Sequence, residues 1–401
     1  MIQIRSITYN LPSLVTNDHF TLIKKSTLLW DKFDVFIRTK RLSFVPFDEP
    51  VSLDYFKNVD RLCNDCGIRW FNVPINPWNT KSSNKLYEFG YEILKNFDQS
   101  FVNINTVFNG KVDCEILNKS VKLIKRVGKM SNNGKDNFRL GISSNISYDC
   151  PFFPFSMSSG DFSFSIALEL TQEINKIILE NKKTNLVVLR DKIITSISSQ
   201  IKYIFDYAIT VEKESGIKFA GFDFSLAPII DENGSVITIL NHIGVNSFGE
   251  TGTIFATAYL TDILKKFADM YPSVGFSGVM YSLLEDLELC KINNEKGVSL
   301  DNLIKLSTMC GCGIDMVPVT EETTDEQLEA AILDVMAIST RLHKPLGIRF
   351  LPIPKSKNGE ISYTTFNEDA DFISNTRVLE LSSNTILNNN IRSFDFLVYK
   401  V

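Results

Sequence analysis

The stretch that decides the fold class is Gly313–Ile353, with the sequence GIDMVPVTEETTDEQLEAAILDVMAISTRLHKPLGIRFLPI. Its apolar start, Gly313–Val319, predicts a buried strand, and Leu346–Ile353 predicts another. Between them, Thr324–His343 has the spacing of an amphipathic helix. A strand, a helix and a strand in this order predict two parallel strands of one sheet, with the helix packed on the sheet.

The same alternation continues outward through most of the 401 residues. It predicts strands at Ile2–Tyr9, Val35–Phe47, Ile68–Ile75, Phe101–Phe108, Phe138–Ser144, Lys218–Leu226, Gly278–Leu283 and Ser393–Tyr399. It predicts helices at Asn17–Phe33, Leu53–Cys66, Asn84–Phe97, Cys114–Gly128, Phe164–Glu180, Leu189–Lys213, Thr253–Met270 and Leu300–Met309. A parallel sheet with this many strands favours a closed α/β barrel over an open sheet. No segment has the composition of a linker, so we expect a single domain over residues 1–401.

Composition excludes some classes of function. The chain has 42 basic and 47 acidic residues and a net charge of -5, which argues against a nucleic-acid-binding protein driven by overall charge. The N-terminal MIQIRSITYN has no basic region followed by a long apolar stretch, and no run approaches the about 20 apolar residues of a membrane span. We therefore expect a cytoplasmic protein that binds neither nucleic acid nor membrane.

The seven cysteines argue against a disulfide framework, because their number is odd and the chain shows no signal peptide. Cys63 and Cys66 form a CxxC motif, and Cys310 and Cys312 form a CxC motif. Together the two motifs would supply chemically suitable ligands for zinc. Buried structural thiols are the simpler interpretation, and it is the one that we favour.

The first candidate site is Gly221–Pro228, GFDFSLAP, at the end of a predicted strand. Asp223 and Ser225 are two residues apart, so their side chains point to the same face. Because the carboxyl ends of parallel strands face the usual ligand crevice, we predict catalytic roles for both, with Asp223 as a metal ligand or general base. The alternative is a buried, hydrogen-bonded acid. His242 is the one plausible catalytic imidazole among the three histidines.

The second candidate is the turn Ser247–Thr253, SFGETGT, which leads into the predicted helix Thr253–Met270. Free backbone N–H groups and the positive end of the helix dipole favour an anion at such a place. We therefore predict that Thr251, Gly252 and Thr253 bind an anionic group of a ligand. The alternative is a turn that only caps the helix.

Further acids and arginines complete the candidate site. Glu285 and Asp286 are adjacent, and Asp315 lies within the apolar strand Gly313–Val319. Such carboxylates can hold a divalent cation such as Mg²⁺ or divide acid and base roles, or they can simply start a solvated helix. The predicted strands also carry four basic residues: Arg5, Lys40, Arg41 and Arg349. Those that point inward would bind a carboxylate or phosphate, whereas those that point outward would have no special role.

Seven segments occur in an order that resembles one known family: IRSIT at Ile4, TKRLS at Thr39, CPFFP at Cys150, GFDFSLAP at Gly221, GTIFATAYL at Gly252, GFSGVMYSLLED at Gly275 and GIDMVPVTEETTDE at Gly313. In these segments the chain is similar to the family called domain of unknown function 711. The resemblance implies a closed ten-stranded α/β barrel like that of pyruvate formate-lyase. It does not imply glycyl-radical chemistry, because the end of the chain, Arg392–Val401, contains no glycine.

In such a barrel the strand ends converge on one cavity, which would become an acidic or metal-binding pocket lined by Asp223, Glu285, Asp286 and Asp315. Arg5 and Arg41 would then hold an anionic group of the ligand. The leading prediction is a non-radical enzyme that acts on a small anionic metabolite, assisted by a divalent cation. One alternative is a metabolite-binding regulatory protein without turnover, in which the acids pair with the arginines. Another is an oligomeric scaffold, for which the aromatic segment Pro151–Phe155 would be an interface if it is exposed.

Overall fold

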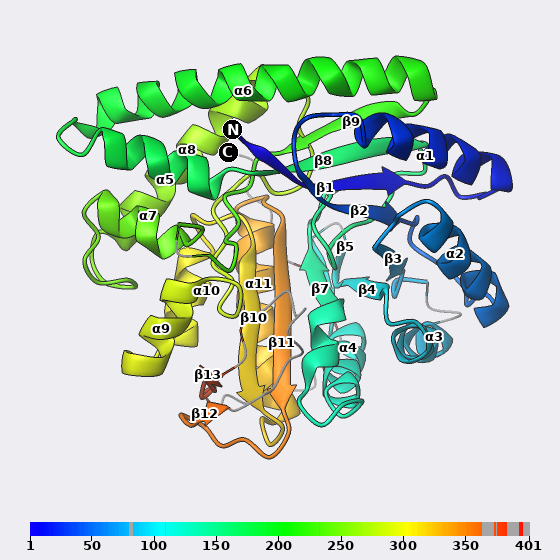
Figure 1. Ribbon diagram of the computed structural model, residues 1–401. Helices are drawn as coiled ribbons and strands as arrows, with labels where there is room; N and C mark the ends of the chain where they lie inside the picture. The colour runs from blue at the N-terminus through cyan, green and yellow to red at the C-terminus, as the bar shows by residue number, and fades with distance from the viewer. Residues whose placement is uncertain are drawn as a thin grey trace.

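The computed structural model describes residues 1–79, 83–108, 110–231, 233–362, 373, 375–382 and 393–395. At its centre is a mixed sheet whose nine strands are hydrogen-bonded in the order β10-β11-β7-β4-β3-β2-β1-β8-β9 (Figure 1). In chain order these strands are β1 (Gln3–Asn10), β2 (Ile37–Ser43), β3 (Trp70–Ile75), β4 (Ser100–Asn105), β7 (Leu140–Ser144), β8 (Ser163–Glu169), β9 (Lys218–Asp223), β10 (Gly313–Thr320) and β11 (Leu346–Ile353). Neighbouring strands are parallel except for the pairs β1–β8 and β7–β11. The α/β class predicted from the sequence is confirmed, since β10 and β11 are parallel neighbours joined by a helix.

Helices join most of the strands and pack against the sheet. They are α1 (Asn17–Trp30), α2 (Leu53–Asp65), α3 (Ser83–Asn96), α4 (Cys114–Val127), α5 (Thr171–Glu180), α6 (Leu186–Ser215), α7 (Val236–His242), α8 (Thr253–Met270), α9 (Leu287–Lys296), α10 (Leu300–Leu306) and α11 (Asp325–Arg341), with a short 3-10 helix η1 (Lys135–Arg139). In Figure 1, α1 to α4 follow the right-hand side of the sheet and α6 lies along its top. Side chains that accept backbone N–H groups fix several helix starts, among them Asp113 at α4, Asn185 at α6 and Thr324 at α11. Within the described residues, no helix combines the length and apolar character needed to cross a bilayer.

The prediction of a closed ten-stranded barrel is wrong. The sheet has nine strands and is open, and its edge strands β9 and β10 are not paired with each other. The segment 272–284 lies between them and makes only isolated bridges, from Ser273 and Val279 to the β9 side and from Ser282 to β10. The predicted strand Gly278–Leu283 therefore does not form a regular strand. Just before it, positive φ angles of 72° at Gly275 and 46° at Ser277 interrupt the extended backbone, so the segment does not run as one strand beside β9.

Two other predicted elements also differ from the structure. The predicted helix Phe164–Glu180 is divided into strand β8 and helix α5, because β8 is fully buried between β1 and β9 and its ladder partners override its helix-forming residues. The predicted strand Ser393–Tyr399 is seen as β14 (Ser393–Asp395), and its remainder lies outside the described residues. β14 pairs with β6 (Lys111–Asp113), which also pairs with β5 (Val107–Phe108). A separate small sheet joins β12 (Ile361–Ser362) and β13 (Thr376–Arg377).

The two faces of the main sheet are covered differently. On β1, the hydroxyl of Tyr9 donates a hydrogen bond to a serine of α1, 3.0 Å away. The adjacent Thr8 points to the other face, where its hydroxyl donates to the carbonyl oxygen of Pro151 at 3.3 Å. The irregular segment Pro151–Ser159 therefore lies on the face opposite α1, and the side-chain amide of Asn72 on β3 also donates to it. This segment forms no regular helix, as its prolines predict.

Candidate functional site

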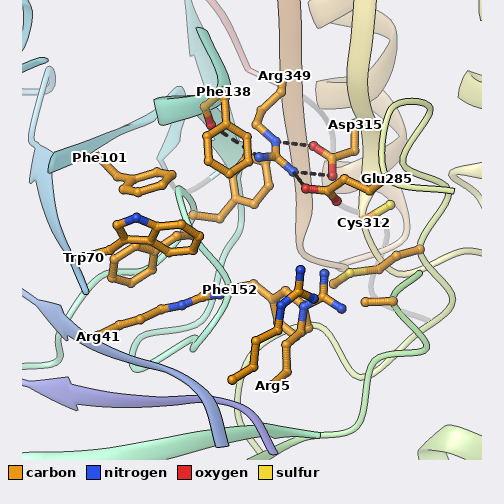
Figure 2. Close-up of a pocket in the computed structure, with 15 residues that line it drawn as sticks. Arg5, Arg41, Trp70, Phe101, Phe138, Phe152, Glu285, Cys312, Asp315 and Arg349 are labelled. Atoms are coloured by element: carbon orange, nitrogen blue, oxygen red, sulfur yellow. Dashed lines mark hydrogen bonds and ion pairs between the residues drawn. The ribbon is translucent and has the colours of Figure 1, made fainter. Parts of the chain in front are cut away.

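The face that carries Pro151–Ser159 is hollowed into a pocket, which we call the arginine–aromatic pocket (Figure 2). Four arginines, six aromatic residues and two acids line it, together with three other residues: Arg5, Arg38, Arg41, Arg349, Trp70, Phe101, Phe138, Phe152, Phe153, Phe155, Glu285, Asp315, Ala227, Met280 and Cys312. In Figure 2, Arg349 lies with the two acids on one side of the pocket, and Arg5 and Arg41 enter from the other.

Arg41 reaches the pocket from β2 and is held there by aromatic rings. Its guanidinium carbon lies 5.0 Å from the ring centre of Trp70 and 5.2 Å from that of Phe153, within the range of a cation–π contact. Its Nε donates to the Thr39 hydroxyl at 3.0 Å, and its Nη1 donates to the Pro151 carbonyl at 3.2 Å. These contacts fix the plane of the guanidinium group, which is what an arginine needs to bind a carboxylate with two parallel hydrogen bonds.

Arg5 and Arg38 share one carboxylate. Arg5 lies where the register of β1 against β8 shifts, and its Nη1 is 3.1 Å from one oxygen of Glu169 and 3.0 Å from the Pro228 carbonyl. Arg38 is 3.3 Å from the other oxygen of Glu169. Phe152 lies 5.6 Å from the Arg5 guanidinium carbon. The bulge on β1 turns Arg5 to the pocket face, whereas strict alternation would place it on the helix face with Tyr9.

Arg349 on β11 is bound to both acids of the pocket. Its Nε and Nη2 lie 2.5 and 2.7 Å from the two oxygens of Asp315 on β10, and its Nη2 is 3.4 Å from Glu285. Burial by itself lowers the pKa of Arg349, but the charges of Asp315 and Glu285 outweigh burial and raise it well above its ordinary value. Around the pocket, four guanidinium groups thus face three carboxylates when Glu169 is included.

The aromatic wall is seated on glycines. Phe155 packs so closely on β11 that a Cβ at Gly347 would lie 2.5 Å from its ring, and a Cβ at Gly141 on β7 would lie 2.5 Å from Pro154. No real Cβ atom tolerates such distances, so these two strands need glycine for the segment to approach them. Phe152, Phe153 and Phe155 are all buried. The segment is therefore a wall of the pocket in this chain, and the interface predicted for the case of exposure does not arise.

Asp223 and Ser225 lie next to each other but outside the pocket lining. Asp223 is completely buried, and its carboxylate accepts hydrogen bonds from the Ser225 hydroxyl at 2.5 Å and from three backbone N–H groups, those of Ser225, Phe276 and Ser277, at 2.8, 2.7 and 3.1 Å. Burial raises the pKa of Asp223, although these hydrogen bonds act in the opposite direction. The carboxylate therefore attaches the segment 272–284 to β9. This is the buried, hydrogen-bonded acid that the sequence offered as the alternative to a catalytic residue.

The four predicted metal-binding acids lie in three separate places. Asp286 is buried and accepts hydrogen bonds from the Ser235 hydroxyl at 2.5 Å and from backbone N–H groups at the starts of α7 and α9. Asp223 binds the segment beside β9, and Glu285 and Asp315 bind Arg349. Among the residues that the structure describes, no group of three His, Cys, Asp or Glu side chains is arranged to hold a metal ion. The structure thus does not bring these acids together as a cation site.

The other predicted site residues lie away from the pocket lining. His242 ends α7, and its Nδ1 is 2.8 Å from the Asn175 side-chain oxygen. Burial lowers the pKa of His242. Thr251 and Gly252 are exposed at the start of α8, and the Thr253 hydroxyl accepts a hydrogen bond from the Gly249 N–H at 3.1 Å. Lys40 also points elsewhere, toward Asp31 on the helix side of β2.

Sequence reasoning missed most of the pocket wall. Trp70, Phe101 and Phe138 belong to predicted strands, but their apolar side chains gave no signal that separates a pocket from a core. Arg38 and Glu169 were not singled out, and Glu169 lay in a predicted helix. The detectable signal was the density of strand arginines together with the aromatic segment Pro151–Phe155.

A family model and several known proteins are similar to this chain. The family model described as Uncharacterised ACR (DUF711) matches residues 4–367, which confirms the resemblance drawn from the ordered motifs. A UPF0210 protein of Pyrobaculum arsenaticum is 30% identical over 227 residues, which cover 55% of this chain and 51% of that protein. A UPF0210 protein of Methanococcus aeolicus is 23% identical over 391 residues, which cover 89% of this chain and 83% of that protein. The chain thus spans about half the length of the first relative and most of the second.

Proposed function

The chain belongs to the family described as Uncharacterised ACR (DUF711), and on that premise we propose that it binds a small anionic molecule in the arginine–aromatic pocket. The observation that carries this proposal is the convergence of four arginines and six aromatic residues on one hollow of the sheet. Guanidinium groups held against rings are oriented in advance, so little side-chain entropy is lost when an anion binds. The rings would contact a flat or apolar part of the same molecule.

Arg5 and Arg41 are the residues that we propose to contact the anion, as the sequence also predicted. Both enter the pocket from the same side, and Arg41 is oriented by Trp70 and Phe153. Arg349 is the less suitable binder, because its Nε and Nη2 hold Asp315 through two hydrogen bonds, whereas Arg5 holds Glu169 through Nη1 alone.

The pairing of the acids bears on whether the protein turns its ligand over. Glu285 and Asp315 are the two acids of the pocket lining, and both are bound to Arg349. A carboxylate whose oxygens already accept hydrogen bonds from a guanidinium group is badly placed to accept a proton from a ligand. This pairing favours a metabolite-binding protein over an enzyme that uses these carboxylates as acid and base.

We propose a cytoplasmic location for the protein, which the seven free cysteines support, because free thiols are typical of a reducing compartment. We propose a small molecule as its partner, because the lining residues surround a hollow of limited size. A homo-oligomer remains a prediction of the sequence.

Isothermal titration calorimetry with benzoate tests the proposal. Benzoate combines one carboxylate with one ring, and benzamide is its uncharged counterpart of the same shape. We expect benzoate to bind the protein at least tenfold more tightly than benzamide, because a hydrogen bond to a charged group contributes about 1.5–3 kcal/mol. Replacing Arg41 by methionine should remove this preference while leaving the ring contacts.

Arg126→Met is the matched control. Like Arg41, Arg126 lies over an aromatic ring, that of Tyr91 at 3.5 Å. It pairs with Glu88 and, unlike Arg41, it is exposed and lies outside the pocket lining. Binding of benzoate to this variant should equal that of the parent protein. Equal affinity for benzoate and benzamide, or loss of binding in both arginine variants alike, would show that the pocket is not an anion site.

A further inference from the structure

The CxC motif places two thiols side by side at the wall of the pocket. The chain bends at residues 310–312, between α10 and β10, and Cys310 and Cys312 are each 1% exposed. Their sulfur atoms lie 3.9 and 3.8 Å from one carbonyl oxygen, that of Gly313. Both thiols therefore turn toward the same point of the backbone.

Glycines on both sides of Cys312 let this stretch pack closely and turn. A Cβ at Gly311 would lie 2.6 Å from the Cα of Gly278, so this position accepts no side chain. Gly313 has a φ of 86°, which favours glycine. The Cα atoms of residues two apart are separated by at most two steps of about 3.8 Å, and a bend brings them toward the about 4.4–6.8 Å of a disulfide.

A positive charge lies beside the pair. The Nζ atom of Lys344 donates to three carbonyl oxygens, those of Ser307 at 2.9 Å, Thr308 at 3.1 Å and Cys310 at 2.5 Å. The neighbouring Cys312 thiol and the charge of Lys344 lower the pKa of the Cys310 thiol in spite of burial. The neighbouring Cys310 thiol and burial raise the pKa of the Cys312 thiol. A lowered pKa on one thiol of a pair favours thiol–disulfide exchange.

The two sulfurs differ in their access to the pocket. Both belong to the buried core, but only Cys312 also belongs to the pocket lining, with Asp315 and Arg349. The other cysteine motif lacks this arrangement. Cys63 and Cys66 lie outside the pocket lining, and burial raises the pKa of both thiols.

From these contacts we propose that Cys310 and Cys312 are a redox-active dithiol that reduces small anionic disulfides held in the arginine–aromatic pocket. The entry of an anionic reagent rests on the proposed function of the pocket, whereas the dithiol itself rests on the contacts of the two sulfurs.

In the first step the Cys312 sulfur attacks one sulfur of the bound disulfide, and the proton that Cys312 loses goes to the half of the reagent that leaves. In the second step the Cys310 sulfur attacks Cys312, and its proton goes to the second half of the reagent as that half leaves. The protein has lost two electrons and two protons, the reagent has become two thiols, and an external low-molecular-weight thiol is needed to restore the dithiol.

The test compares two small disulfides of opposite charge, dithiodiglycolate and cystamine. The reduced full-length protein is mixed with either reagent, quenched with acid, alkylated in denaturant and analysed by mass spectrometry. We expect dithiodiglycolate to reduce the alkylated thiols from seven to five, with the loss mapped to Cys310 and Cys312. Its rate should exceed that of cystamine at least tenfold, and Arg41→Met should reduce this ratio.

Serine variants separate the two steps. Cys310→Ser should stop at a mixed disulfide on Cys312, and Cys312→Ser should give neither product. The double variant Cys63→Ser/Cys66→Ser is the matched control and should still lose two thiols at the parent rate. Circular dichroism melting checks that each variant is folded.

The outcomes distinguish the two proposals. Seven alkylated thiols in the native protein, under conditions in which the denatured protein reacts, would overturn the dithiol. A Cys310–Cys312 disulfide that forms equally fast with both reagents would support the dithiol and contradict the anion-binding pocket as its entrance. Benzoate binding without any disulfide would leave the pocket in place and remove the dithiol.

Discussion

At the scale of single residues, the carboxylate of Asp223 joins β9 to the segment that follows α8. It accepts backbone N–H groups from Ser225, Phe276 and Ser277 in a site without solvent. In Asp223→Ala these buried donors lose their acceptor. Each unsatisfied donor lowers the free energy of unfolding by about 1–3 kcal/mol. We expect the free energy of unfolding to fall by about 3 kcal/mol or more, measured as a lower Tm by differential scanning calorimetry.

Asp54→Ala provides the comparison for this substitution. Asp54 is an exposed acid in the first turn of α2 that pairs with Lys57. Exposed ion pairs of this kind contribute little to stability, so the Tm of Asp54→Ala should equal that of the parent protein. A Tm of Asp223→Ala as high as that of Asp54→Ala would show that Asp223 does not hold the segment, and would reopen its role as a catalytic acid.

The residues that sequence reasoning found differ from those that it missed in a physical way. Arg5 and Arg41 were predicted to hold an anion, and both line the pocket, whereas Lys40 points to the other face. Alternation explains the opposite directions of Lys40 and Arg41. It does not explain Arg5, whose direction depends on a bulge in β1 that arises from the pairing with β8. The surroundings of an acid such as Asp223 likewise depend on tertiary contacts that one sequence does not reveal.

At the scale of elements, one carboxylate caps two helices. Asp286 accepts backbone N–H groups from Val236 in α7 and from Glu288 and Leu289 in α9. In Asp286→Ala, both helix starts lose their acceptor. We expect faster amide hydrogen exchange in the first turns of α7 and α9 together, measured by mass spectrometry.

Asp113→Ala is the single-helix counterpart. Asp113 caps α4 alone, through the N–H groups of Glu115 and Ile116. Faster exchange should then be confined to the start of α4. If Asp286→Ala changes exchange in α9 and leaves α7 unaffected, the double cap is wrong.

The contact between β11 and the aromatic segment predicts a difference between two glycine substitutions. A Cβ at Gly347 would lie 2.5–2.7 Å from the ring of Phe155, so Gly347→Ala must displace a wall of the pocket. We expect Gly347→Ala to lower the free energy of unfolding by about 1–3 kcal/mol and to weaken benzoate binding. Gly90→Ala in α3 meets only ordinary contacts of 3.4–4.0 Å, and the better helix former should leave Tm equal or higher. Equal Tm values for the two variants would contradict this packing.

Regular elements were predicted well where a local pattern and the final pairing agree. The strands and helices from Gly313 to Ile353 are examples, because their apolar spacing matches the faces that they bury. Ser163–Glu169 was predicted as helix, since its ladder with β1 and β9 is a long-range feature. The segment 272–284 resembled a strand in composition, but its close approach to Asp223 at Gly275 requires a bent backbone.

At the scale of the whole molecule, Arg349 ties one end of the sheet, β10 and β11, to the segment that lies between the two edges. It joins β11 to β10 through Asp315 and to the segment 272–286 through Glu285. In Arg349→Met both carboxylates stay in place without their counter-ion, and breaking a buried ion pair costs about 3–5 kcal/mol. We expect a marked fall in Tm.

A double variant shows whether the loss comes from the unpaired charge. Arg349→Met/Asp315→Leu removes the buried carboxylate together with its partner and should recover part of the lost Tm. A Tm of Arg349→Met that equals the parent value would mean that this network does not hold the segment to the β10–β11 end of the sheet.

Whether the sheet closes is a feature of the architecture that a single sequence does not determine. Repeated strand–helix units predicted an α/β protein correctly, but they did not determine whether the sheet closes, because closure depends on how its two edges meet. In this chain the edges meet an irregular segment, and the sheet stays open. The four predicted metal-binding acids are consequently distributed over three sites, and the arginines define the pocket instead.

The central claim is that the arginine–aromatic pocket binds an anion, and its most direct test is a crystal structure of the protein soaked with 4-bromobenzoate. Anomalous scattering from bromine locates the ligand independently of any assumption about the site. We predict bromine density between Trp70, Phe101 and Phe153, with the carboxylate within hydrogen-bond distance of Arg41 or Arg5. Bromine found only outside this pocket, or a carboxylate turned away from both arginines, would contradict the account.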